Sequence, residues 1–148
     1  MGLGLYPVFD PRLTGPKPPF LGEMLGDAFR ELDRVAAQHG LTRLTSFADT
    51  RIVPPTFRGH PDELDAVIGP RSDWHHPEDG IAAAAALADL IAGDRRLAGR
   101  FEYPEAVVEE LRELAALLAL GRDQGARFRL ALRVCSKSLT RLVSVDVP

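Results

Sequence analysis

The stretch at 126–134, read Ala-Arg-Phe-Arg-Leu-Ala-Leu-Arg-Val, decides the fold that we expect for this chain. Apolar side chains alternate with arginine and alanine, which is the period of a β-strand with one buried face and one solvated face. The apolar set is Phe128, Leu130, Leu132 and Val134, and the arginines are Arg127, Arg129 and Arg133. The rest of the chain is therefore expected to supply the elements that cover the apolar face.

Further elements are expected on the N-terminal side of this strand. The apolar run at 2–9 predicts a short strand, which Pro7 restricts to a sheet edge or a bulge. Apolar residues spaced by three and four predict helices at 22–38 and 104–119, and a proline start followed by an alanine-rich run predicts another at 77–92. Two more strands are predicted, at 41–48 and at 139–147, the second pairing as a hairpin with 126–135.

These elements favour an α+β fold, because strands lie at both ends of the chain with helices between them. We expect a small antiparallel sheet, made from the N-terminal strand, a middle strand and the C-terminal hairpin, packed on about three helices. The length of 148 residues suits a single domain, 1–148. A long Pro/Gly-rich loop region at 49–80, with a helical turn or two at 61–68, is expected within it.

The composition excludes some classes of protein. A hydrophobic content of 45% and a charged content of 26% argue against wholesale disorder. The net charge of −3 gives no general attraction to nucleic acid, and no apolar run is long enough to cross a bilayer. The single cysteine, Cys135, excludes an intrachain disulfide. We expect a cytoplasmic bacterial protein, the bacterial origin resting on the preference for arginine over lysine.

The charge is unevenly distributed along the chain. Residues 122–148 carry a net charge of +4, so the remainder must carry −7. The segment 61–79 is the most acidic, with six carboxylates against Arg71 alone. Such polarity would suit a partner of opposite charge or self-association, although separate solvated faces explain it equally well.

One group of side chains could hold a metal. His60, Asp73, His75 and His76 combine imidazole and carboxylate, which suit zinc, iron or manganese. The spacing matches neither His-Glu-x-x-His nor a structural zinc motif. The alternative is that His60 and His76 cap helices that start at Pro61 and Pro77, with the nearby acids placed at those helix starts.

A second group could bind a protein partner. Trp74, between Asp73 and His75, is the only tryptophan and would be either a buried anchor for the loop or an exposed contact residue. Arg127, Arg129 and Arg133 would present guanidinium groups to an acidic partner or simply form a solvated sheet face.

Four segments resemble sequences of small, uncharacterised bacterial proteins. They are Gly-Leu-Tyr-Pro-Val-Phe at 4–9, Ser-Phe-Ala-Asp-Thr-Arg at 46–51, Pro-Asp-Glu-Leu-Asp at 61–65 and Trp-His at 74–75. The resemblance covers residues 4 to about 132. It implies no particular activity, cofactor or catalytic residue.

The function expected from the sequence is that of a small binding module. It would act by protein–protein contact, without catalysis or a cofactor, as an accessory, regulatory or immunity-type protein. One alternative is a metal-dependent hydrolase with its site in the 60–79 loop. Another is a structural homodimer formed through the edge of the terminal hairpin.

Overall fold

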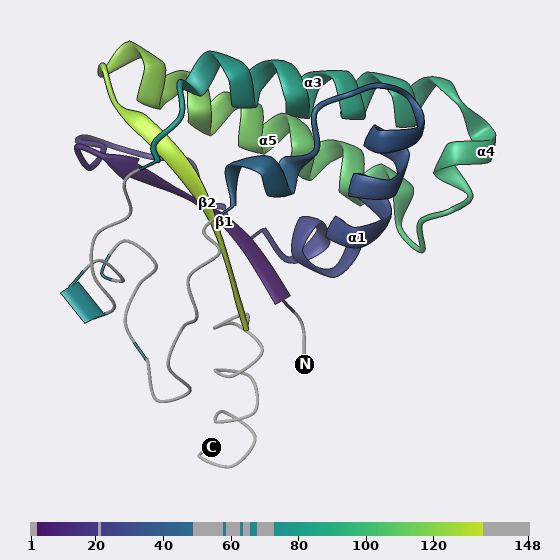
Figure 1. Cartoon of the computed structure of the whole chain (residues 1–148), viewed down its shortest axis with the longest axis horizontal. Coiled ribbons are helices and arrows are strands. Elements are labelled where there is room, and N and C mark those ends of the chain that lie inside the picture. Colours follow the sequence, from purple (N-terminus) through teal and green to yellow (C-terminus); the bar gives the residue numbers. More distant parts are fainter. Residues whose placement is uncertain are drawn as a thin grey trace.

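The computed structural model describes residues 3–20, 22–48, 58, 63, 66–67 and 73–134. Strands from the two ends of this part pair with each other, and the helices lie to one side of the pair (Figure 1). The α+β class predicted from the sequence is confirmed. No helix among the described residues is both long and apolar enough to span a membrane.

The two strands run antiparallel over their full length. They are β1 (Leu3–Asp10) and β2 (Arg127–Val134). Phe9 lies opposite Phe128 and Pro7 opposite Leu130, so these residues share the helix-facing side of the pair. Phe128 and Leu130 are fully buried, as the alternation in 126–134 predicts.

The outer edge of β1 explains how Pro7 fits into a strand. The Leu5 N–H donates to the carbonyl oxygen of Gly22 at 3.0 Å, away from β2. Because the pattern repeats every two residues, the backbone nitrogen of Pro7 also faces away from β2. The missing N–H of Pro7 therefore removes no bond between the strands, and the predicted edge position is confirmed.

The far edge of β2 makes two short backbone contacts. The N–H groups of His75 and Phe128 each donate to the other residue's carbonyl oxygen, both at 2.9 Å. Ala48 forms a parallel bridge with Leu130. These contacts bring the two ends of the segment between η1 (Leu44–Phe47) and α3 (Pro77–Gly93) onto the same strand.

The three predicted helices are confirmed, with one shift in length. They are α1 (Glu23–Gln38), α3 (Pro77–Gly93) and α5 (Pro104–Asp123). The last of these runs four residues beyond the predicted end, because Gly121 lies inside the helix against the ring of Phe9. Gly125, with a φ of 71°, follows the helix end.

A short fourth helix connects α3 to α5. This helix, α4 (Arg95–Ala98), begins after Asp94, whose carboxylate accepts the backbone N–H groups of Arg96 at 2.9 Å and Leu97 at 3.3 Å. It turns the chain at the end of the helical layer, so that α3 and α5 pack side by side (Figure 1).

The main core lies between the strands and the helices. Its fully buried side chains include Leu5 from β1, Leu32 from α1, Leu87 from α3, Leu111 from α5 and Phe128 from β2. A smaller cluster, formed by Leu13, Leu117 and Ala126, fastens the loop after β1 to the end of α5. Each long element therefore buries one apolar face in a shared interior.

The strand predicted at 41–48 is wrong. Residues Leu44–Phe47 form the 3₁₀ helix η1, and only Ala48 bridges to the sheet. Leu44 and Phe47, three residues apart, are both buried, which matches one turn of such a helix. Asp33 of α1 accepts hydrogen bonds from the backbone N–H and the hydroxyl of Thr45, so a tertiary contact holds the turn.

Other predictions fall outside the described residues. The last strand at 139–147, and with it the terminal hairpin, is one of them, and most of the turn predicted at 61–68 is another. Within the loop region at 49–80, the described residues are 58, 63, 66–67 and 73–80, of which 77–80 already belong to α3.

Candidate functional site

Trp74 and Arg129 form the centre of the site that the sequence indicated. The guanidinium carbon of Arg129 lies 4.3 Å from the centroid of the Trp74 ring, which is cation–π geometry. Trp74 itself is half-buried, so its exposure is intermediate between that of a buried anchor and that of an exposed contact residue, the two roles predicted for it.

The prediction that Arg129 lies on a solvated sheet face is wrong, because this side chain is 0% exposed. Alternation along β2 does place Arg129 opposite to the helix-facing residues, but the Trp74 ring lies over it there. Val8, its cross-strand neighbour on the same face, is also buried. This face is therefore a second packed region around the middle of the strands.

The ring of His75 packs against two aromatic rings. Its ring meets Phe47 edge-on at 5.1 Å and lies 6.0 Å from the ring of Phe128. Its Nε2 atom is buried and has no hydrogen-bond partner among the described residues. The backbone pairing with Phe128 fixes this position, which gives His75 a structural role at the edge of β2.

The remaining residues of the predicted partner-binding set are dispersed. Asp73 and Arg127 are both exposed, and Arg127 lies opposite Asp10 at the end of the sheet. The side chain of Arg133 lies outside the described part of the chain. The structure therefore brings Trp74, Arg129 and His75 to the edge of β2, where much of their surface is used for internal packing.

The metal-binding set is only partly described. His76 occupies the N-cap position of α3, with Pro77 as the first helical residue, which is the position that the capping alternative requires. Its side chain is exposed and makes no capping hydrogen bond. No three His, Cys, Asp or Glu side chains in the described ranges could together hold a metal ion. His60 lies outside those ranges, so the four-residue site stays a prediction.

A groove that sequence reasoning missed lies between α1 and the segment joining α4 to α5. We call it the Tyr103 groove, and it has a volume of about 210 Å³. Its lining residues are Met24, Asp27, Ala28, Glu31, Arg100, Phe101, Glu102, Tyr103 and Val107. Tyr103 is 58% exposed and, with Val67, is one of two large exposed hydrophobic residues in the described part of the chain.

The Tyr103 groove combines an apolar floor with an acidic wall. Phe101 and Val107 are buried and belong to the main core, whereas Glu102 and Asp27 are exposed. Three lining carboxylates face one guanidinium, that of Arg100, which gives the described lining a formal charge of −2. The chemistry suits a partner group that is both apolar and cationic.

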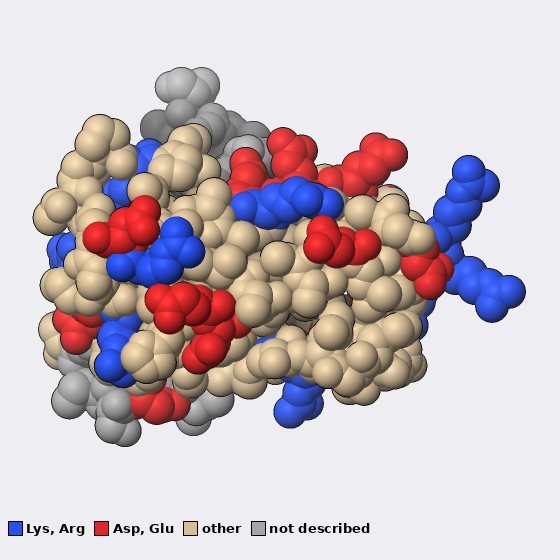
Figure 2. Space-filling model, turned by 90° about the horizontal axis from the view of Figure 1, so that it is seen from above, with Lys and Arg blue, Asp and Glu red and all other residues tan. Residues whose placement is uncertain are grey.

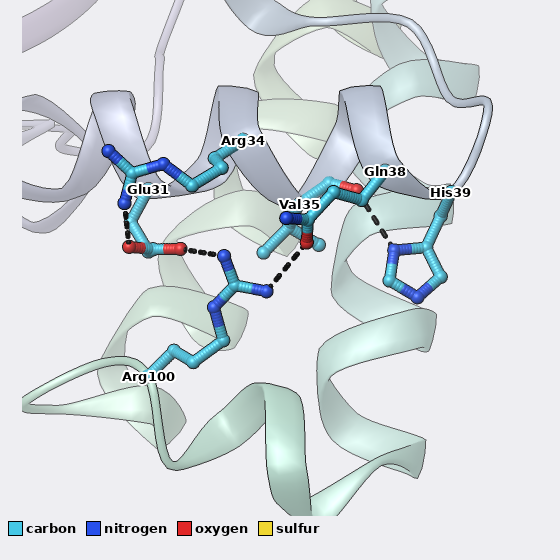
Figure 3. A network of polar contacts seen from close by, with 6 residues as sticks. All are labelled: Glu31, Arg34, Val35, Gln38, His39 and Arg100. Carbon is cyan, nitrogen blue, oxygen red and sulfur yellow. Dashed lines mark hydrogen bonds and ion pairs between the residues drawn. The ribbon is translucent and has the colours of Figure 1, made fainter.

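An ion-pair network fixes one wall of this groove (Figure 3). Arg100 reaches α1, where it contacts Glu31 at 2.5 Å and donates to the Gln38 side chain at 2.8 Å. Arg34 contacts the other oxygen of the Glu31 carboxylate at 2.8 Å. The Glu31 and Arg100 side chains are 23% and 30% exposed, so these contacts are only partly screened by water. The segment carrying Tyr103 is thereby anchored to α1.

The sequence did contain a weak signal for Tyr103. It stands between Glu102 and Pro104, and Pro104 opens α5, so Tyr103 takes the N-cap position. An aromatic residue at a helix start has no neighbour on the preceding turn to pack against. Only the fold, however, places α1 beside it.

Charges elsewhere on the helical layer are mixed. Figure 2 shows acidic and basic side chains interspersed on this face, with basic side chains projecting at the end where α4 lies. The exposed Arg95 and Arg96 belong to α4. These two arginines provide a surface charge that is separate from the lining of the groove.

Glu110 of α5 binds the start of α1. Its carboxylate accepts a hydrogen bond from the backbone N–H of Leu25 at 3.0 Å. The N-cap residue of α1 is Gly22, which has no side chain that could accept this bond. Burial of Glu110 raises the pKa of this carboxyl above its ordinary value of 4.5, and the backbone hydrogen bonds from Leu25 and Met24 offset only part of that rise.

We expect Glu110→Gln to change how stability depends on pH. Because the folded protein binds a proton at Glu110 more tightly than the unfolded chain, the stability from this group falls as pH rises from 4.5 through the folded pKa. Glutamine keeps the oxygen acceptor but does not ionise, so the variant should become more stable relative to wild type as the pH rises above 4.5.

Urea unfolding at a series of pH values measures this difference. Glu109→Gln, at an exposed neighbouring position on α5, is the matched control and should leave the pH profile unchanged. A constant difference between the Glu110 variant and wild type across the series would contradict the assignment.

Comparison with known proteins adds no relative. No protein-family model, curated protein sequence or solved structure matches the chain significantly. The chemistry of the described residues is thus the only guide to function.

Proposed function

We propose that the protein is a binding module without catalytic activity that recognises a basic segment of another protein through the Tyr103 groove. An accessory, regulatory or immunity-type protein would use such a module. The observation that carries the proposal is the position of Tyr103, a largely exposed aromatic ring at the border of an apolar groove with acidic lining. Tyrosine at such a border is a typical contact residue of protein interfaces.

The groove's dimensions suit one anchoring side chain rather than a whole substrate. A volume of about 210 Å³ accommodates a side chain such as leucine or phenylalanine, which would rest on Phe101 and Val107. Lysine or arginine residues flanking that anchor would meet Asp27 and Glu102, and one of them could stack on the Tyr103 ring. The anchoring pocket gives affinity, and the acids give the preference for a basic partner.

The rigid setting of the groove supports the same proposal. The ion pairs of Arg100 hold the α4–α5 connection on α1, and Phe101 is buried in the core. A preformed groove loses little conformational entropy when a partner binds, which raises affinity for a given contact area.

Selection of peptides from a random displayed library on the immobilised protein tests the proposal. We expect enriched sequences that combine one large apolar residue with two or more lysines or arginines. Tyr103→Ser and Glu102→Lys should each weaken binding of those peptides by about tenfold, since contact residues of this kind contribute above about 1 kcal/mol.

Glu109→Lys is the matched control, because it reverses one charge on α5 at an exposed position that does not line the groove. Peptide binding should survive this change. Failure to enrich any basic sequence, or equal loss of binding in the control, would overturn the proposal.

A further inference from the structure

A second cleft, distinct from the Tyr103 groove, lies beside the outer edge of β1 and under the loop at 11–20. It has a volume of about 390 Å³, within the range of small-molecule sites. Its apolar lining includes Phe9, Leu13, Phe20 and Leu117. The charged residues among its described lining are Arg12 and Lys17, both cations. We call it the β1 cleft.

We propose that the β1 cleft binds a small amphipathic carboxylate, with the carboxylate at Arg12 and Lys17 and the apolar body along Phe9 and Phe20. Guanidinium binds carboxylate through two parallel hydrogen bonds, and the lysine ammonium adds a point charge. If an inorganic anion bound alone, the apolar lining would stay in contact with water. The cleft therefore favours a ligand that has both a carboxylate and an apolar body.

The backbone of β1 directs a further donor toward the edge beside the cleft. The Leu5 N–H points away from β2, and by strand alternation the N–H of Phe9 is also directed to this outer edge. Phe9 also lines the cleft, so its N–H is directed to the strand edge beside which the cleft lies. Cations combined with a backbone donor are a common arrangement in anion recognition.

The loop that carries the cations is held in place from both sides. The Thr14 N–H donates to the Gln124 side-chain oxygen at 2.9 Å, and the Gln124 amide donates back to the Thr14 carbonyl at 3.0 Å. Leu13 packs in the small cluster with Leu117. Prolines on either side of Lys17, at 16, 18 and 19, restrict the backbone further. The backbone that carries Arg12 and Lys17 is therefore held before any ligand binds, which lowers the entropic cost of binding.

The volume limits the size of the ligand. At roughly 30 Å³ for each non-hydrogen atom, about a dozen atoms fill the cleft. A straight-chain carboxylate of eight carbons is within this limit, and so is a short aromatic carboxylate. Octanoate is the simplest probe of this chemistry, and octan-1-ol provides the same chain without the charge.

Calorimetric titration of the full chain with octanoate, octan-1-ol and inorganic phosphate tests the inference. We expect saturable binding of octanoate, at least about tenfold weaker binding of octan-1-ol, and weaker binding of phosphate than of octanoate. Binding of octan-1-ol or phosphate as tight as that of octanoate would overturn the inference, as would the absence of saturation.

Variants locate the binding within the molecule. Arg12→Gln with Lys17→Gln should weaken octanoate binding by at least about tenfold, because both cations contact the carboxylate. Arg95→Gln with Arg96→Gln removes the same charge at α4 and should leave the affinity unchanged. Equal effects of the two pairs would show that general electrostatic attraction, rather than the β1 cleft, accounts for binding.

Discussion

Replacing Gly22 with alanine is expected to lower the free energy of unfolding by about 3 kcal/mol or more. Gly22 has a φ of 70°, in the left-handed region that disfavours a side chain. A Cβ added there would overlap the carbonyl oxygen of Leu5, which is backbone and cannot rotate away. Strand β1 and the start of α1 would have to separate to make room.

The same residue joins two elements through a single oxygen atom. The Gly22 carbonyl accepts the Leu5 N–H at 3.0 Å and the Gly26 N–H at 2.9 Å, so it closes the first turn of α1 while holding the edge of β1. A shift that relieves the clash would lengthen one or both hydrogen bonds. The conformational strain and the lost hydrogen bonding would therefore add to each other.

Gly40→Ala provides the matched control for this prediction. Gly40 has nearly the same φ, 69°, but beyond its chain neighbours nothing lies within 4 Å of the position that a Cβ would occupy. This variant should cost only the left-handed strain, about 1 kcal/mol. Chemical denaturation of both variants measures the difference, and equal losses would show that the approach of Leu5 to Gly22 contributes nothing.

The helices were predictable because their signals are local. Leu25 and Leu32 repeat at helical spacing in α1, and both are fully buried. Pro77 and Pro104 each mark the first turn of a helix, at the positions where the missing N–H breaks no hydrogen bond. Strand 126–134 was predictable for the same reason, since its alternation is contained in the strand itself.

The errors arose where a distant residue decides the local structure. Asp33 of α1 holds Thr45 in η1, so a segment with weak strand character becomes a 3₁₀ turn. Trp74 covers Arg129, so an arginine on an apparently solvated face is buried. Neither contact leaves a periodic trace in the sequence, because each joins residues that are far apart along the chain.

The two candidate sites were invisible in the sequence for a related reason. The Tyr103 groove needs α1 beside the α4–α5 connection, and the β1 cleft needs the loop at 11–20 beside the end of α5. Tyr103 and Lys17 belong to no motif, and their chemistry arises from the neighbours that the fold provides. By contrast, Trp74 was singled out because it is the only tryptophan in the sequence. In the structure its ring packs over Arg129 and is only partly exposed.

Phe128→Ala is the second change with a large expected effect, a loss of about 3–5 kcal/mol in the free energy of unfolding. The Phe128 side chain is 0% exposed, and its ring centroid lies 5.3 Å from that of Phe47 and 6.0 Å from that of His75. The variant would leave a cavity where β2, η1 and α3 meet. Because a domain is usually stabilised by only about 5–15 kcal/mol, the melting temperature should fall sharply.

Phe29→Ala is the control for Phe128→Ala. The Phe29 ring is only half-buried, on α1, so the same loss of atoms should cost clearly less. Thermal and urea unfolding of the two variants measures the contrast. Similar losses at the two positions would contradict the central place given to Phe128.

The contact between Phe128 and Gly80 allows a sharper test by a double-mutant cycle. A Cβ added at Gly80 of α3 would lie 2.5 Å from the Phe128 ring and 2.7 Å from a methyl carbon of Leu118. Gly80→Ala alone should therefore destabilise by about 1–3 kcal/mol, despite the helix propensity of alanine. In the Phe128→Ala background the ring is gone, and the Leu118 methyl group can shift into the vacated space, so the same change should cost clearly less. This favourable coupling follows only if the ring packs directly on the α3 backbone, and strictly additive losses would refute that packing.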